Sequence, residues 1–327
     1  MVVPAQLFSV PFASAKWKKI GWAIQEFRQY MLQMIADEKK LIKEGKPGSN
    51  NLVSNLVRAA EDSGKTHRES RVMKPLSVDE ILGNIFVFNF AGHDTTAISL
   101  SYSMLLLVAN PEVQDWLSEE IQAVLPSEHW ETWDYQKAFP ELRRCLAVLL
   151  ETLRLYNPLP GVPKWTGDSS QTLEIMQRTC VLPPRTLVVP ALQTLHTHPR
   201  YWGSDSLTWR PSRWIQTQSK PIFNVDVKTR LSSERLLTPI PGTFIAWSEG
   251  VRNCPGKKFA QVEFVATMAR LFHSHRVTPI PKNGEIMLEA QRRVLDVVKD
   301  SNVHLLLQMR NPGSVAVKWT RKEDMAS

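Results

Sequence analysis

The most restrictive stretch of this sequence is Phe244-Ile245-Ala246-Trp247-Ser248-Glu249-Gly250-Val251-Arg252-Asn253-Cys254-Pro255-Gly256. Cys254 stands between two glycines, Pro255 follows it, and the apolar residues from Phe259 to Phe264 have helical spacing. Proline is favoured at the first helical position, because its missing N–H would be unpaired there in any case. We therefore predict a helix that begins here, with Cys254 as its N-cap.

The residues around Cys254 favour a thiolate. The positive end of the helix dipole, Arg252 and the pair Lys257-Lys258 would all stabilise a negative sulfur, which is the form of cysteine that binds a soft metal. Gly250 and Gly256 allow a tight turn and the close approach of a flat ring, which a Cβ would obstruct. A lone cysteine in such a loop is most often a structural thiol, so the interpretation depends on the whole pattern.

The whole pattern, aromatic-x-x-Gly-x-Arg-x-Cys-x-Gly, resembles the haem-binding loop of the cytochrome P-450 superfamily, in which cysteine is the proximal iron ligand. The resemblance implies that Cys254 ligates the iron of haem b (iron protoporphyrin IX) and that Arg252 pairs with a haem propionate. Gly250, Gly256 and Trp247 would also bind the cofactor. Trp247 stands where the family most often has phenylalanine, and it would keep a flat apolar cover on the sulfur side.

Composition restricts the compartment and the partners. The chain has 327 residues, a formal charge of +8 and three cysteines, Cys145, Cys180 and Cys254. The cysteines have no paired spacing, which argues against a disulfide framework and favours a reducing compartment. The basic residues are scattered and not interleaved with aromatic residues, so we expect no nucleic acid partner but an acidic protein or a membrane surface. Prolines interrupt residues 1–15, which are predicted to be neither a membrane-spanning helix nor a signal peptide.

The first third of the chain is predicted to be helical. Apolar spacing indicates an amphipathic helix over 17–40 and a second helix over 51–61, followed by a polar, basic loop over 62–73. Packing on the core is the simplest use of the first helix. In the superfamily that it resembles, the corresponding region roofs the substrate cavity and touches the membrane.

A long central helix is predicted over 77–109. Ser77 and Glu80 form a capping box at its start, and the next breaker is Asn110-Pro111. At 1.5 Å per residue the helix would be roughly 48 Å long. Gly92 and the β-branched residues after it predict a kink or a widened turn near the middle, which would free backbone carbonyls.

The middle of this helix reads Ala91-Gly92-His93-Asp94-Thr95-Thr96, which resembles the oxygen-activation motif of the same superfamily. The resemblance implies that Thr95 hydrogen-bonds bound oxygen and that Asp94 delivers protons from solvent. His93 lies off this face and is not expected to contact the iron. In isolation, an Asp-Thr pair would more often satisfy local backbone groups.

A buried ion pair is predicted on the helix over 141–156. Glu151 and Arg154 are three residues apart on one face, within a strongly apolar segment, and buried charges require partners. Arg213, in Trp209-Arg210-Pro211-Ser212-Arg213-Trp214, is the candidate third member. The set resembles the superfamily's Glu-x-x-Arg helix and its later arginine, so its role is predicted to be structural.

Two weaker candidates lie between these segments. Lys164 falls where the family often places a basic partner of a haem propionate, and His196 matches a family histidine at the haem edge. In isolation they would more often be a surface lysine and a capping histidine. Short strands are predicted over 179–190, a polar meander over 215–241, the haem-thiolate loop with its helix over 244–273, and a terminal hairpin that joins 303–309 to 314–319.

These motifs occur in one order along the chain and together indicate the cytochrome P-450 fold, mainly α with small β-sheets. We expect one domain over 1–327, in which the N-terminal part of the family fold is missing, and a fungal microsomal-like member acting in secondary metabolism. The implied reaction inserts one atom of O2 into a small apolar organic substrate, with electrons from an NADPH-dependent flavoprotein reductase. The resemblance also implies a monomer at the cytosolic face of the endoplasmic reticulum membrane, although we identify no anchor in this chain.

Two alternatives come from other functional classes. A truncated, haem-free remnant without catalysis would explain the missing N-terminal part. A haem-thiolate isomerase or dehydratase would need no reductase, but such enzymes often lose the acid-threonine pair that Asp94 and Thr95 represent here.

Overall fold

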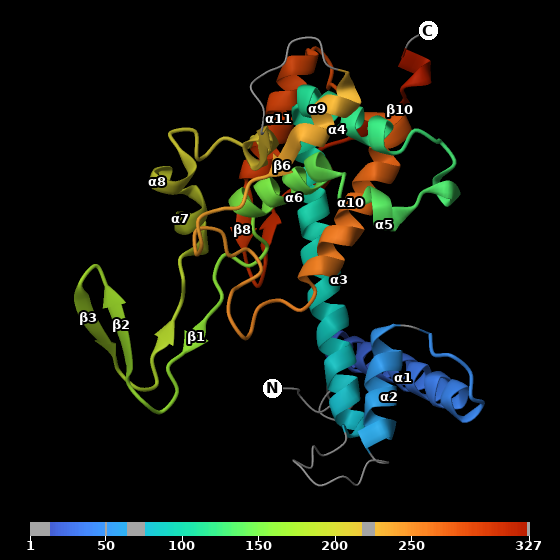
Figure 1. Cartoon of the computed structure of the whole chain (residues 1–327), viewed down its shortest axis with the longest axis vertical. Coiled ribbons are helices and arrows are strands. Elements are labelled where there is room, and N and C mark those ends of the chain that lie inside the picture. The colour runs from blue at the N-terminus through green and yellow to red at the C-terminus, as the bar shows by residue number, and fades with distance from the viewer. Residues whose placement is uncertain (1–13, 50, 64–75, 218–225, 326–327) are drawn as a thin grey trace. The chain divides into compact units, whose positions relative to one another are not determined.

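The computed structural model describes residues 14–49, 51–63, 76–217 and 226–325 (Figure 1). The chain divides into two compact units, residues 1–93 and 94–327. Predictions for residues 1–13, for the basic loop after residue 63 and for positions 218–225 of the polar meander lie outside the described residues.

The first unit is built from helices. α1 (Ala15–Lys43) and α2 (Leu52–Ser63) confirm the two helices predicted near the start of the chain. Their apolar faces form a small core with the first turns of α3. This core includes Met31, Ile35, Val57, Ile81 and Ile85. Glu38 is buried and accepts hydrogen bonds from the side chains of Ser49, Ser54 and Arg58, which ties the start of α2 to α1.

α3 (Val78–Ala109) agrees with the helix predicted over 77–109 to within one residue. The capping box is present, since the Ser77 N–H donates to Glu80 Oε2 at 2.7 Å and the Glu80 N–H donates to Ser77 Oγ at 3.2 Å. The predicted widened turn is wrong, because the α-helical pattern continues through Gly92. A Cβ on Gly92 would meet nothing within 4 Å, so no close neighbour distorts the helix at this point.

The second unit packs around α10. Its helices are α4 (Pro111–Val124), α5 (Tyr135–Ala138), α6 (Arg143–Leu155), α7 (Leu192–Thr197), α8 (Pro199–Trp202), α9 (Val227–Ser233), α10 (Lys257–Ser274) and α11 (Met287–Lys299). Short 3-10 turns occupy Trp130–Thr132, Pro211–Trp214, Pro312–Ser314 and Glu323–Met325. α10 lies beside α6 and the C-terminal half of α3 (Figure 1). Its residues Phe264, Met268 and Phe272 are fully buried in a cluster with residues of α4, α6 and α3.

The described strands form antiparallel pairs, each of two strands. β1 (Lys164–Trp165) pairs with β4 (Leu187–Val188), β2 (Gln171–Ile175) with β3 (Arg178–Leu182), β5 (Ile215–Thr217) with β6 (Glu234–Leu236), β7 (His275–Pro279) with β10 (Val317–Arg321), and β8 (Ser301–Val303) with β9 (Leu307–Met309). The predicted class, mainly α with small sheets, is confirmed, and so are the short strands within 179–190.

The predicted terminal hairpin is wrong. β9 pairs with β8, which lies just before it in the chain, and β10 pairs with β7 at the end of α10. In this register Trp319 is opposite Val277, which is fully buried, and the Trp319 ring lies 5.5 Å from that of Phe272. β10 therefore covers the core at the end of α10, which a local hairpin with β9 would leave exposed.

A second buried charge network, which the sequence did not predict, joins α4, α6 and β6. Arg144 is 2% exposed and donates to Glu234 at 2.6 and 3.0 Å and to Glu119 Oε2 at 2.7 Å. Buried Glu120 accepts the backbone N–H groups of Arg144 and Cys145 at the start of α6. Burial raises the pKa of Glu120 to about 7, because it disfavours the charged form of this carboxyl group.

Replacing Arg144 tests how much this network stabilises the second unit. Arg144→Met should lower the free energy of unfolding by about 3–5 kcal/mol, because it leaves buried carboxylates without their cation. Arg143→Met is the matched control, since this arginine pairs with the half-exposed Glu141 and its loss should cost about 1 kcal/mol or less. Urea denaturation measures the free energy of unfolding of both variants. Equal losses would show that the buried network stabilises the fold no more than the Arg143–Glu141 pair does.

Candidate functional site

The Cys254 loop folds back on itself through backbone hydrogen bonds. The Cys254 N–H donates to the Trp247 carbonyl at 2.8 Å, and the Asn253 N–H donates to the Gly250 carbonyl at 3.1 Å. Gly250 has a φ of +85°, a conformation that favours glycine. The loop therefore presents the Cys254 thiol at its surface, where it is exposed.

Cys254 precedes the helix rather than capping it. α10 begins at Lys257 and its N-cap is Gly256, whose carbonyl accepts the Ala260 N–H at 2.9 Å. The expectation that Cys254 is the N-cap and Pro255 the first helical residue is therefore wrong. The Cys254 carbonyl accepts the Lys257 N–H at 3.4 Å, which is a turn bond between residues three apart, and bonds between residues four apart begin at the Gly256 carbonyl.

The surroundings of the thiol fit a flat apolar group. A Cβ on Gly256 would lie 3.8 Å from Cys254 Sγ, which is an ordinary van der Waals contact, and a Cβ on Gly250 would meet nothing within 4 Å. Val251 is fully exposed and Phe259 is 71% exposed, so two apolar side chains close to Cys254 in sequence face solvent. An accessible cysteine sulfur can serve as the axial ligand of a haem iron, and apolar side chains beside it are compatible with a flat apolar ring.

Both predicted propionate partners, Arg252 and Lys164, lie on this loop or against it. Lys164, in β1, donates from Nζ to Ser248 Oγ at 3.0 Å, and this contact brings β1 to the loop. Arg252 is on the loop itself, and both cations are exposed. The Trp247 ring is half-buried, packs edge-on against Phe244 and lies 5.4 Å from the Lys257 ammonium. Cofactor contacts of these residues stay predictions.

His196 holds the start of the loop. Its ring is fully buried 5.0 Å from that of Phe244, and Nε2 accepts the Ile245 N–H at 3.1 Å. Burial, together with the Arg154 charge, lowers the pKa of His196 to about 4. The imidazole is therefore neutral and carries its proton on Nδ1, a buried atom without a hydrogen-bond partner among the described residues. The structure shows His196 positioning the loop, and its contact with a haem edge stays a prediction.

The ion network on α6 fixes His196 in turn. Arg154 and Glu151 are fully buried and form two hydrogen bonds of 2.8 Å. Arg154 also donates to the carbonyls of His196 and Ser206 at 2.8 and 2.5 Å. Each charge therefore has the partners that burial demands.

The third arginine completes the network. Arg213 donates to Glu151 Oε1 at 3.4 Å and to Asp205 Oδ1 at 2.9 Å. Trp214 Nε1 donates to Glu151 Oε2 at 2.9 Å, and the Asp205 contact keeps Arg213 anchored to the turn before it. The structure therefore contains the predicted contact between α6 and the Arg213 segment.

Asp94 and Thr95 lie on α3. Asp94 is exposed, Thr95 is half-buried, and the Thr95 carbonyl accepts the Ser99 hydroxyl at 2.8 Å. Further along α3, Tyr102 bonds Ser301 at 2.6 Å and anchors the C-terminal half of the helix. The roles of Asp94 and Thr95 in oxygen activation stay predictions.

Sequence patterns did not reveal every residue that shapes the loop. Asn157 donates from Nδ2 to the Ala246 carbonyl at 3.2 Å and accepts the Leu159 N–H at 2.9 Å, so it joins the end of α6 to the loop. Ser248 has a φ of +62° and receives Lys164. The only sequence signal for Asn157 was its position directly before a proline. This pattern indicates a turn but not a contact with the Cys254 loop.

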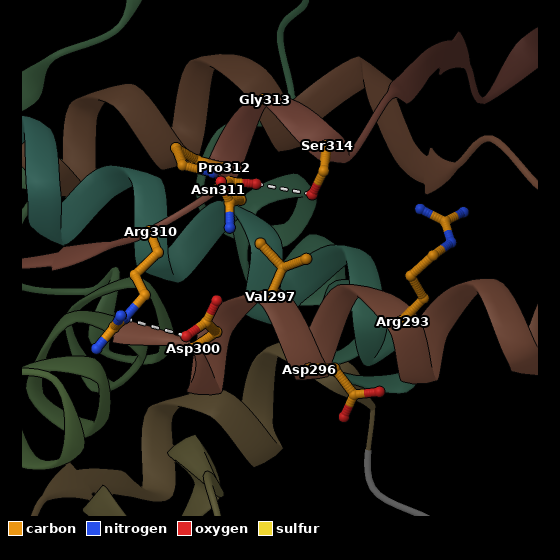
Figure 2. Close-up of a pocket in the computed structure, with 9 residues that line it drawn as sticks. All are labelled: Arg293, Asp296, Val297, Asp300, Arg310, Asn311, Pro312, Gly313 and Ser314. Atoms are coloured by element: carbon orange, nitrogen blue, oxygen red, sulfur yellow. Dashed lines mark hydrogen bonds and ion pairs between the residues drawn. The ribbon is translucent and has the colours of Figure 1, made fainter. Parts of the chain in front are cut away.

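A wide hollow of about 710 Å³ lies elsewhere in the second unit, between α11 and residues 310–314 (Figure 2). Arg310 pairs with Asp300 at 3.2 Å across it, and Arg293 is bound to Glu285. None of the motif residues lines this hollow. Among the described residues, no helix combines the length and the apolar character needed to cross a membrane.

Comparison with known proteins identifies the class. The family model for cytochrome P-450 matches residues 2–305. A cytochrome P-450 monooxygenase of Arthrobotrys oligospora is 31% identical over 302 residues, which cover 88% of this chain and 51% of that protein. A cytochrome P-450 monooxygenase of the phomenoic acid biosynthesis cluster of Leptosphaeria maculans is 29% identical over 299 residues, 85% of this chain and 48% of that protein.

The chain therefore belongs to the cytochrome P-450 family. It spans about half the length of the curated relatives that it matches. The family is one of haem proteins, which agrees with the exposed sulfur and open surroundings of Cys254.

The His196 geometry predicts a pH dependence of stability. Because its folded-state pKa is about 4 instead of 6.5, the neutral ring stabilises the fold fully above pH 6.5, and this contribution is lost as the pH falls to about 4. The loss amounts to about 3 kcal/mol. His196→Gln, which does not titrate, should lose correspondingly less between pH 7 and pH 4. Urea denaturation at several pH values measures the difference, and parallel curves would contradict the assignment.

Proposed function

We propose that this chain carries the haem-thiolate site of a monooxygenase that inserts one atom of O2 into an apolar organic substrate. The observation that carries the proposal is the exposed Cys254 thiol on a glycine-framed loop, in a chain of the cytochrome P-450 family. Cys254 would be the iron ligand of haem b. Gly250, Gly256 and Trp247 would border the macrocycle, and Arg252 would pair with a propionate.

Two further residues are proposed to serve the cofactor from neighbouring segments. Lys164 would be a second cation for the propionates, supported by its hydrogen bond to Ser248 of the loop. His196 would act from the buried side, where it orients Phe244 and Ile245. Glu151, Arg154 and Arg213 would keep this arrangement rigid without touching the reacting atoms.

Bound haem would supply the redox chemistry that activates O2, and the protein residues would supply its ligand and its protons. The Cys254 sulfur would donate electron density to the metal, as a thiolate does in this class. The Thr95 hydroxyl would hold a proton by hydrogen bonding, and the Asp94 carboxylate would relay protons from solvent. The exposure of Asp94 and the partial burial of Thr95 support that direction of transfer.

The electron donor is proposed to be an NADPH-dependent flavoprotein reductase with an acidic docking face. Lys257 and Lys258 are exposed directly after the Cys254 loop, and the chain has a formal charge of +8. Such charges guide an acidic partner to the surface and raise the rate of association. The partner would thereby dock beside the cysteine that ligates the haem.

Our proposals for the substrate, the cellular location and the pathway are based on membership of the cytochrome P-450 family. We propose a small apolar substrate in secondary metabolism, as the biosynthetic cluster named for the relative from Leptosphaeria maculans suggests. We also propose a monomer that contacts the cytosolic face of the endoplasmic reticulum membrane. The proposal includes no nucleic acid partner, because the basic residues are scattered along the chain.

The alternatives predict different chemistry. A haem-free remnant would take up no haem, and an isomerase or dehydratase would turn over without a reductase. The presence of the Asp94-Thr95 pair and the names of the relatives, which are monooxygenases, favour the oxygen-inserting reaction.

Charge reversal at Lys257 and Lys258 tests the proposal. In the haem-loaded protein, the double change Lys257→Glu and Lys258→Glu should slow reductase-driven turnover roughly tenfold and leave peroxide-driven turnover unchanged. The neutral pair Lys257→Gln and Lys258→Gln is the control for lost ring contacts, and it should give an intermediate rate. Product formation with each electron source is measured.

The possible outcomes separate the alternatives. Equal losses with reductase and with peroxide would show that the lysines act on the haem site and not on docking. Haem uptake without product from either electron source would refute monooxygenase activity. Turnover of an oxidised substrate without any electron source would favour the isomerase or dehydratase.

A further inference from the structure

A second hollow of about 590 Å³ lies in the second unit, where α4, α9, β7 and the C-terminal segment meet. Its charged lining residues are Asp115, Glu119, Arg276 and Lys322. None of the residues proposed to bind haem or activate oxygen lines it. Lys322 also lies beyond residue 305, where the match to the family model ends.

Lys322 differs from an ordinary surface lysine in what its ammonium group contacts. It follows β10 directly and is half-buried, and its Nζ donates to the carbonyls of Phe272 and His273 at 2.6 and 2.8 Å. Its backbone N–H donates to the Ser274 carbonyl at 2.9 Å. These carbonyls belong to the last turn of α10, so Lys322 closes the C-terminal end of the central helix of this unit.

The carboxylates that line the hollow together with Lys322 are already paired with arginines. Arg276 holds both oxygens of Asp115, at 2.5 and 3.2 Å. Glu119 is shared between Arg144 and Arg230. Within the described part of the chain, no carboxylate forms an ion pair with Lys322. Other titratable groups around it are His273, whose ring bonds the Leu125 carbonyl, His275, which is opposite Arg321 in the β7–β10 register, and the exposed neighbours of Lys322 in the chain.

Two opposing effects act on the protonation of Lys322. The negative end of the α10 dipole favours the ammonium form. Burial favours the neutral amine and lowers the pKa to about 8, with Arg276 acting in the same direction and Asp115 against it. A neutral amine has two N–H donors, and the two carbonyls would use both. Losing the third proton therefore costs no hydrogen bond and leaves a lone pair.

We propose that Lys322 is a site of covalent acylation by small activated acyl donors, such as acyl phosphates or thioesters, that enter this hollow. The nitrogen lone pair attacks the acyl carbon and forms an N–C bond, while the C–O or C–S bond to the leaving group breaks and its electron pair leaves with that group. The displaced proton goes to solvent. The resulting amide has one N–H instead of two, so one carbonyl at the end of α10 loses its donor.

Competitive labelling of the intact chain with trace acetic anhydride tests this proposal. Acetylation of each lysine is measured by peptide mass spectrometry from pH 6 to 10, in the haem-free and the haem-supplemented protein. Lys322 should label with a midpoint near pH 8. At pH 7.5 it should react roughly tenfold faster than Lys318, an exposed lysine on the preceding strand β10, because burial lowers the pKa of Lys322 and leaves more of it as free amine.

A variant that leaves Lys322 in place tests the cause. Arg276→Gln removes the neighbouring cation and releases the Asp115 carboxylate, so the labelling midpoint of Lys322 should rise and its advantage over Lys318 should shrink severalfold. Arg293→Gln is the matched control, because Arg293, which lies on α11 (Figure 2), forms another arginine–carboxylate pair, with Glu285. It should leave the labelling of Lys322 unchanged.

The opposite result has a definite meaning. If Lys322 reacts more slowly than Lys318 at every pH from 6 to 10, it is a permanently charged cap of α10 and the proposal is wrong. A midpoint that does not move in Arg276→Gln would also overturn it.

Discussion

The buried ion pair between Glu151 and Arg154 is the contact on which the Cys254 loop depends. Removing two charges from water is costly, and the cost is offset only when every donor and acceptor has a partner. Here those partners come from the His196 carbonyl, the 205–210 segment and the Pro211–Trp214 turn. Segments far apart in sequence are therefore fixed around α6 by one requirement, that two buried charges be satisfied.

A short series of hydrogen bonds connects this ion network to the loop that carries the Cys254 sulfur. Arg154 holds the His196 backbone, the His196 ring holds the Ile245 N–H, and the Trp247 carbonyl holds the Cys254 N–H. α10 begins immediately afterwards and is buried along its core-facing side. The thiol is thus exposed on a loop whose two ends are anchored in the core. Anchoring of this kind is what a preorganised binding site requires.

Sequence reasoning was reliable where the determinant is local or is a whole motif. The Ser77-Glu80 capping box set the start of α3, and the spacing of Glu151 and Arg154 indicated a buried pair. Sequence reasoning failed where turn geometry or contacts between distant segments decide the structure. A turn at Cys254–Lys257 delays the start of α10, and β10 pairs with β7, where Trp319 is opposite the buried Val277. The Arg144 network and the Asn157 contact join residues whose separation in sequence carries no pattern.

The central claim is that Cys254 of this chain is the thiolate ligand of a haem. The most direct measurement is the ferrous–CO difference spectrum of the purified, haem-supplemented chain, recorded beside Cys254→Ala and, as a control, Cys180→Ala. The account predicts a Soret band shifted far to the red of that of histidine-ligated haem, retained in the control and lost in Cys254→Ala. A band typical of histidine ligation, or no haem uptake at all, would contradict it.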